Sequence, residues 1–143
     1  MAGDGPIRDL DRLLADMEPS LNGSLAGFTV VPNLTAALGR WPEAAIIGTF
    51  REAEGLSVIL DLAHPAAQGA DISFKAAWIT LTVHSDLEAV GLTAAFATSL
   101  GEAEISCNVI AALHHDHIFV PEADGQKAMA VLRDLQQKAA RKS

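Results

Sequence analysis

Apolar and polar positions alternate most clearly over residues 78–84. Ile79, Leu81 and Val83 alternate there with Trp78, Thr80, Thr82 and His84. A period of two places successive side chains on opposite faces of a strand. The segment is therefore predicted to be a strand with one strongly apolar face, and Phe74 is expected to extend it toward the N-terminus.

The period changes to that of a helix after this strand. Ser85 and Glu88 have the spacing of a capping box, and the apolar positions from Leu92 onward recur at helical spacing. Gly91 interrupts the run and divides a first loose turn from the main helix, which Thr93 is also able to cap. Unpaired amides at such an N-terminus attract carboxylate or phosphate, but a plain capped helix start has the same pattern.

Two further strands and a helix are expected after residue 104. The apolar face of the first strand consists of Ile105, Cys107, Val109, Ala111 and Leu113. Residues 114–116 are expected to turn into a strand over residues 118–120. Pro121 closes that strand because proline cannot donate a hydrogen bond within a sheet. Asp124 then caps the final helix.

The first part of the chain begins with a predicted helix. Pro6 fits the first helical position, and Pro19 stops the helix. Residues 20–27 are interpreted as a polar, glycine-containing loop before a short strand over residues 28–31. Residues 33–42 have no clear pattern.

A hairpin and a linker follow. Residues 45–51 and 56–62 are strand-like and flank Glu54 and Gly55, which indicates a β-hairpin. The proline- and glycine-containing segment 64–71 separates two halves, so we predict domains over residues 1–68 and 69–143. The second half lacks one strand of a β-α-β-β-α-β unit, and an open sheet edge promotes aggregation. A strand from the first half, or from a second subunit, is expected to cover that edge.

Composition narrows the functional classes. The 143 residues suffice for one ordinary domain or two very small ones. A formal net charge of −8 argues against a nucleic-acid or anionic-membrane partner. The single cysteine excludes an internal disulfide, and its place on an apolar strand face indicates an inert thiol. No apolar run reaches the length of a membrane span and no signal peptide is visible, so a cytoplasmic protein is expected.

The polar run His114-His115-Asp116-His117 is the main candidate for chemistry. Asp116 either anchors an ammonium or guanidinium group or is a turn residue. His115 and His117 share a strand face and, with His84, give a three-imidazole metal site as a minor alternative. No phosphate loop, nucleophile elbow or paired-cysteine motif is present, so we expect neither an enzyme nor a cofactor.

Four segments carry a resemblance to a known family. They are residues 78–96 (WITLTVHSDLEAVGLTAAF), 105–111 (ISCNVIA), 115–121 (HDHIFVP) and 50–56 (FREAEGL). The chain resembles a bacterial family of small tandem ACT-domain proteins without an established activity, and its C-terminal half distantly resembles the CASTOR-type arginine sensors. The resemblance implies an α+β, ferredoxin-like tandem ACT fold, with antiparallel sheets and helices packed on one face.

The resemblance also implies a function and a site. ACT modules are regulatory and bind amino acids where paired modules meet, so the chain is expected to bind an amino acid or similar zwitterion and to form a homodimer or higher homo-oligomer. The implied ligand-binding residues lie in the first strand-to-helix turn and the last two strands: His84, Ser85, Asp86, Val90, Gly91, Leu92, Asn108, Ile110, His115, Asp116 and His117. A structural oligomerisation module without ligand, and a metal-dependent enzyme built on the histidines and Asp116, are the alternatives.

One departure from the family pattern concerns a helix end. The family often has glycine where this chain has Glu104. A helix end there favours a left-handed residue, which glycine supplies without strain. Gly101 is expected to take over that role.

Overall fold

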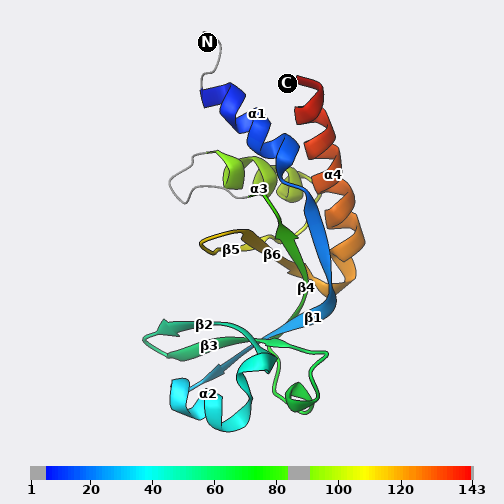
Figure 1. The fold of residues 1–143 in the computed structure, drawn as a ribbon. Helices are drawn as coiled ribbons and strands as arrows, with labels where there is room; N and C mark the ends of the chain where they lie inside the picture. The colour runs from blue at the N-terminus through cyan, green and yellow to red at the C-terminus, as the bar shows by residue number, and fades with distance from the viewer. Residues whose placement is uncertain (1–5, 84–90, 143) are drawn as a thin grey trace.

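The computed structural model describes residues 6–83 and 91–142, which form a six-stranded antiparallel sheet in the order β2-β3-β1-β4-β6-β5 (Figure 1). The strands are β1 (Pro19–Val31), β2 (Ile46–Glu52), β3 (Gly55–Asp61), β4 (Phe74–Leu81), β5 (Asn108–Ala111) and β6 (Asp116–Pro121). The α-helices are α1 (Pro6–Asp16), α2 (Leu34–Arg40), α3 (Leu92–Glu102) and α4 (Gly125–Lys142). Within the described ranges, no helix is long and apolar enough to cross a bilayer.

Strands β1 and β4 join the two halves of the sheet. β1 pairs with β3 through residues 26–31 and with β4 through residues 19–28. It therefore lies where the strand missing from the second half belongs, beside β4, β6 and β5. This confirms the expectation that a strand from the first half covers that edge. In turn, β4 of the second half flanks the β1-β3-β2 group, so each half of the sheet is completed by a strand from the other half. The predicted boundary between two domains at residue 68 stays a prediction.

The prediction of a loop over residues 20–27 is wrong. These residues belong to β1, which has a register shift between Leu21 and Leu25. A Cβ atom on Gly27 would lie 2.7 Å from Leu62 Cδ2, so glycine here permits close packing rather than a turn. Partners on both sides of β1 satisfy its backbone groups, and this pairing overrides the low β-propensity of its polar residues.

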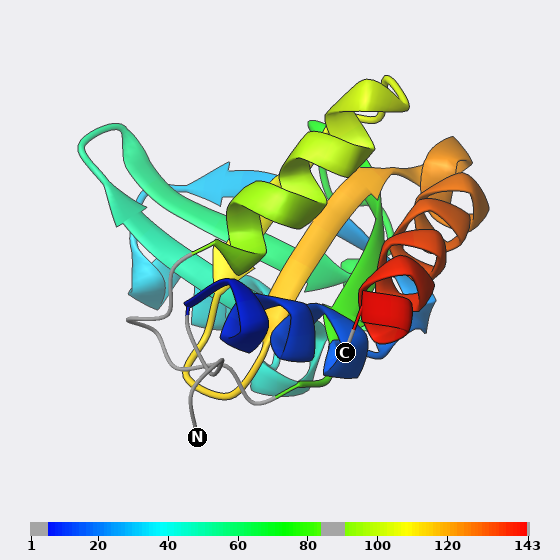
Figure 2. The same cartoon turned by 90° about the horizontal axis from the view of Figure 1, so that it is seen from above.

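The α-helices of the described residues, α1 to α4, pack on one side of the sheet, as predicted. Helices α1, α3 and α4 cover β4 and β6, as Figure 2 shows from above. The core beneath them includes Ile79, Leu81, Phe96, Leu100, Ile118 and Leu132, each with no exposed surface. Helix α2 covers β1 and β3 over a second core that includes Ala37, Val58 and Leu60. Both cores lie on the same face of the sheet. Gly27 of β1 faces Leu60 of the second core, and Leu25 of β1 faces Ala77 of the first. Leu25 and Gly27 are two residues apart on one strand and so share a face.

The remaining elements mostly follow the sequence. The predicted hairpin is β2 and β3, and Phe74 begins β4 as expected. Strand β5 is shorter than predicted: Ile105 is buried before it begins, and Leu113, predicted on the apolar face, is 67% exposed. The apolar alternation thus continued past the ends of the strand.

The end of α3 explains why β5 begins late. The Ile105 amide donates to the Leu100 carbonyl at 2.9 Å, and the Glu104 amide donates to the Gly101 carbonyl at 2.9 Å. These two bonds make a Schellman motif, whose C′ residue adopts the left-handed conformation. That residue is Glu104, with φ of +62°, so the expectation that Gly101 takes this role is wrong.

Candidate functional site

A cleft of about 500 Å³ lies on the sheet face opposite the helices. One wall comes from β2, β3 and the turn before them, and the other from β4, β5, β6 and the β5–β6 turn. The lining residues are Ala44, Ile46, Ile47, Gly48, Ile59, Asp61, Trp78, Ile110, Ala112, His117 and Phe119. Both halves of the chain therefore contribute to the cleft.

Strand register explains why these side chains converge. Trp78 faces Phe119, and Ile110 faces His117, in the β4–β6 and β5–β6 ladders. Residues directly opposite each other project to the same face of a sheet. The Trp78 and Phe119 rings stack with centroids 6.3 Å apart and an angle of 19° between their planes. The result is a broad, flat aromatic wall.

A chain of hydrogen bonds holds the polar part of this wall. Trp78 Nε1 donates to His117 Nδ1 at 3.1 Å, and Thr80 Oγ1 lies 3.3 Å from the same nitrogen. Asn22 Nδ2 donates to the Trp78 carbonyl and to Thr80 Oγ1, at 3.0 and 3.1 Å. A neutral histidine that accepts at Nδ1 carries its proton on Nε2. His117 is thus positioned as a hydrogen-bond donor through Nε2.

The protonation of His117 agrees with this arrangement. Burial lowers the pKa of the imidazole, and the neighbouring His115 lowers it further, while Asp116 acts in the opposite direction. Desolvation disfavours the charged form of any base. The ring is therefore neutral at neutral pH, as the Trp78 hydrogen bond requires.

Asp61 brings an acidic group to the opposite wall. It is the last residue of β3, and its Oδ1 accepts a hydrogen bond from the Ala63 amide at 2.9 Å. This bond fixes the side chain through one oxygen and leaves the second carboxylate oxygen able to accept from a ligand. Asp61 was not predicted as a site residue, although the alternation along β3 places it on one strand face with Ser57 and Ile59.

The structure separates the predicted site residues of the last two strands. Ile110 and His117 line the cleft, whereas the side-chain Nδ2 of Asn108, on the same face, donates to the Phe119 carbonyl at 3.1 Å. Asp116 faces Leu81 in the ladder and so projects to the helix-covered side. Burial raises the pKa of Asp116, against the opposing effect of His117 and His115. His115 Nδ1 is buried and has no hydrogen-bond partner among the described residues.

The predicted strand-to-helix turn is only partly described. His84, Ser85, Asp86 and Val90 lie outside the described residues, as does the proposed capping box. Gly91, with φ of +104°, precedes α3 as its N-cap, so the alternative cap at Thr93 is wrong. Leu92 is buried, and Leu10 of α1 packs so closely that its Cδ2 would lie 3.2 Å from a Cβ on Gly91. Helix α1 thus packs against Gly91.

Metal ligands do not gather in the part of the chain that the structure describes. No group of three or more His, Cys, Asp or Glu side chains there is arranged to hold a metal ion. The three-imidazole alternative also needs His84, which is outside those residues. Cys107 packs beside the helix-side core, where burial raises the pKa of its thiol and so reduces thiolate reactivity.

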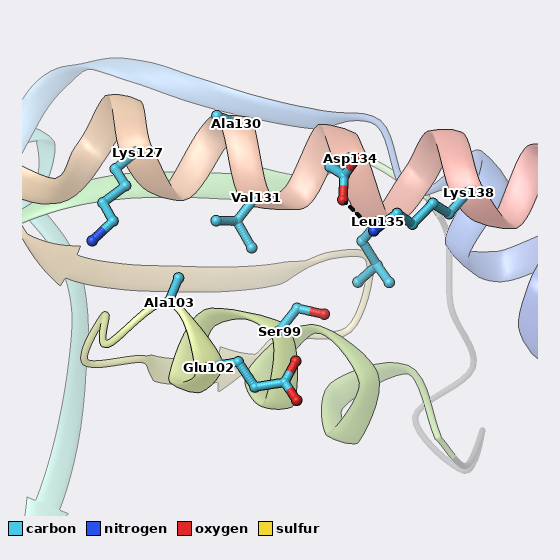
Figure 3. A pocket seen from close by; sticks show the side chains of 9 residues that line it. All are labelled: Ser99, Glu102, Ala103, Lys127, Ala130, Val131, Asp134, Leu135 and Lys138. Atoms are coloured by element: carbon cyan, nitrogen blue, oxygen red, sulfur yellow. Dashed lines mark ion pairs between the residues drawn. The ribbon is translucent and has the colours of Figure 1, made fainter.

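A second hollow lies between α3 and α4 on the outer surface (Figure 3). It measures about 470 Å³ and has Val131 and Leu135 between charged side chains. Lys138 Nζ and Asp134 Oδ2 form an exposed ion pair at 2.9 Å. Exposed pairs of this kind contribute little to stability. None of the predicted site residues that the structure describes lines this hollow.

Comparison with known proteins agrees with this architecture. Two ACT domain models match the chain, one over residues 5–77 and the other over residues 73–134. A protein of unknown function from Vibrio cholerae, described as a possible transport protein, is 44% identical, with 92% of this chain and 99% of that chain covered and a TM-score of 0.78. No protein with a curated description matches significantly.

More distant structures share the fold alone. The ligand-free regulatory subunit of aspartate kinase from Thermus thermophilus is 9% identical, with 85% of this chain and 97% of that chain covered and a TM-score of 0.62. A protein from Agrobacterium tumefaciens is 17% identical, with coverages of 82% and 87% and a TM-score of 0.58. Together with the shared-strand topology, the matches to both halves and to nearly the whole Vibrio protein show that the chain belongs to the ACT domain family, with two ACT modules in tandem.

Proposed function

We propose that the protein is a non-catalytic regulatory module that binds an amino acid or similar small zwitterion at the junction of its two ACT modules. The cleft carries this proposal, because residues of both modules line its volume of about 500 Å³. Small-molecule sites fall between roughly 300 and 1,000 Å³ and combine apolar walls with a few placed polar groups. His117 and Asp61 supply such groups here.

The shared strands give the proposal a route to regulation. β1 and β4 run through both modules, so a ligand that contacts both walls favours one angle between the modules over another. A ligand shifts such an equilibrium by its difference in affinity for the two states. The likeness to the regulatory subunits of aspartate kinase, which share this fold, supports a regulatory role.

Thermal-shift measurements with the twenty amino acids test the proposal. A ligand at about 100 times its Kd stabilises the native state by about 2.7 kcal/mol. For a chain of this size each kcal/mol corresponds to roughly 2–4 °C, so the expected rise in Tm is about 5–10 °C. If no amino acid raises Tm at millimolar concentration, the proposal is wrong.

A cleft-filling substitution provides the control. Gly48 faces Ile59 in the β2–β3 ladder, and a Cβ there would meet nothing within 4 Å, so Gly48→Trp places an indole in the cleft. Gly23 of β1 also has open space around it but does not line the cleft, so Gly23→Trp is the matched variant. Gly48→Trp is expected to abolish the ligand-induced rise in Tm, and Gly23→Trp to preserve it.

A ligand-free oligomerisation module is the second candidate. Phe50 on the edge strand β2 is 72% exposed, and Val30 on β1 is 56% exposed. Both pair with Ser57 and so share the cleft face, which extends this apolar surface toward the sheet edge. A homodimer that covers it is expected to become monomeric in Phe50→Glu, as measured by light scattering coupled to size exclusion. A monomeric wild-type protein would eliminate this candidate.

A further inference from the structure

The two ionisable side chains among the described cleft residues lie on opposite walls. Asp61 comes from β3 of the first module, and His117 comes from β6 of the second. A carboxylate only accepts hydrogen bonds, and an ammonium group only donates them, so Asp61 suits an ammonium group. The wall that contains Asp61 is thus suited to a cationic donor.

His117 suits the opposite end of a zwitterion. Its Nδ1 already accepts from Trp78 Nε1 at 3.1 Å, which leaves Nε2–H as the donor. Protonation at Nδ1 would place two donors against each other and break the bond to Trp78. The ring is therefore held as a neutral donor that can bond a carboxylate oxygen.

The rest of the cleft is apolar. Ile47 and Ile59 belong to the cluster on this face, together with Trp78 and Phe119. A charged ligand side chain would lose hydration against these surfaces, and the described residues that line the cleft offer no charged partner beyond the two groups already used. A large apolar side chain would instead bury its surface favourably against both walls.

We infer that the ligand is an α-amino acid with a large aliphatic or aromatic side chain, bound with its ammonium group on Asp61, its carboxylate on His117 Nε2–H, and its side chain between the two apolar walls. This rests on the proposed function and assigns the ligand class and the residues that select it. The two polar groups come from different modules, so one ligand bridges the junction. Asp116, which projects to the helix side of the sheet, takes no part.

Titration calorimetry with chemically edited ligands tests the assignment. Leucine and phenylalanine are compared with alanine, glutamate and arginine, and the better of the first two is then compared with its N-acetyl and amide derivatives. The large apolar amino acids are expected to bind at least 10-fold more tightly than the other three. Each derivative is expected to lose at least 10-fold in affinity, because each removes one charged end.

Two matched acid-to-amide variants locate the site. Asp61→Asn keeps an oxygen to accept from the Ala63 amide, so the local turn is preserved while the charge is removed. Asp61→Asn is expected to weaken binding of the ligand at least 10-fold. In this variant, N-acetylation of the ligand is expected to change the affinity very little. Asp116→Asn removes the same charge on the other face and is expected to change affinity by less than 2-fold.

The possible outcomes separate this inference from the proposed function. Tighter binding of arginine or glutamate, or loss of binding in Asp116→Asn but not in Asp61→Asn, would overturn the inference while leaving amino-acid binding intact. The absence of heat and of thermal shift for every amino acid would overturn both.

Discussion

Replacement of Glu104 by glycine is expected to stabilise the protein. Glu104 has φ of +62° and is the C′ residue of the Schellman motif that ends α3. The left-handed conformation costs a residue with a Cβ atom about 1–2 kcal/mol relative to glycine. Both hydrogen bonds of the motif use backbone atoms, so glycine retains them.

The net magnitude follows from three opposing or reinforcing effects. Relief of strain contributes about 1–2 kcal/mol, and the greater freedom of glycine in the unfolded chain subtracts about 0.5–1 kcal/mol. Loss of a negative charge near the C-terminal end of a helix contributes about 0.3–1 kcal/mol at low salt. Glu104→Gly is therefore expected to raise the free energy of unfolding by about 1 kcal/mol and Tm by roughly 2–4 °C.

Urea denaturation followed by circular dichroism measures this change. The midpoint is expected to rise with an unchanged m-value, which indicates a change in stability without a change in the surface exposed on unfolding. Two control variants separate the causes. Glu104→Ala removes the charge but keeps the strain. Glu102→Gly makes the same replacement at the last residue of α3, where φ is not positive and glycine relieves no strain.

A specific result would refute this reasoning. If Glu104→Ala is as stable as Glu104→Gly, charge and not backbone conformation limits stability at this position. If Glu104→Gly is less stable than the wild type, the left-handed conformation at Glu104 does not carry the strain we assign to it.

Two further predictions concern the strand-to-helix turn and the pH dependence of stability. Gly91→Ala is expected to destabilise the protein by at least about 1 kcal/mol in urea denaturation, because φ is +104° and Leu10 would lie 3.2 Å from the new Cβ. The control is Gly39→Ala in α2, where a Cβ would meet nothing within 4 Å, and it is expected to stabilise the protein slightly. Equal effects of the two substitutions would contradict this account. The unfolded state takes up a proton on His117 more readily than the folded state, since burial lowers the folded pKa below the ordinary value of 6.5. Stability is therefore expected to fall as the pH drops below 6.5 toward the folded pKa of His117, and to fall less steeply in His117→Gln. Burial raises the folded pKa of Asp116 above 3.8, so in that lower pH range a falling pH stabilises the folded state through Asp116. Parallel pH profiles of the wild type and His117→Gln would refute the assignment to His117.

The part of the candidate site within one strand could be predicted from the sequence. The alternation in residues 115–119 places His117 and Phe119 on one face, and the structure places both in the cleft. The same alternation places Asp116 on the other face, whereas the resemblance to tandem ACT proteins implied that it shares one ligand site with His115 and His117. Asp61 was missed because its significance depends on a wall formed by residues that lie 17 to 58 positions further along the chain.

The sequence by itself determined helices α1, α3 and α4, the β2–β3 hairpin and the strand that begins at Phe74, because hydrophobic periodicity and capping are local properties. Helix α2 was not predicted, since residues 33–42 have no clear pattern. The sequence also determined that the second half needs another strand. Only the tertiary structure decided that β1 supplies that strand, with polar residues that resemble a loop until β3 and β4 pair on either side. The cleft has the same origin, since two modules that share strands leave part of a sheet face between them, and no local pattern specifies which residues meet across it.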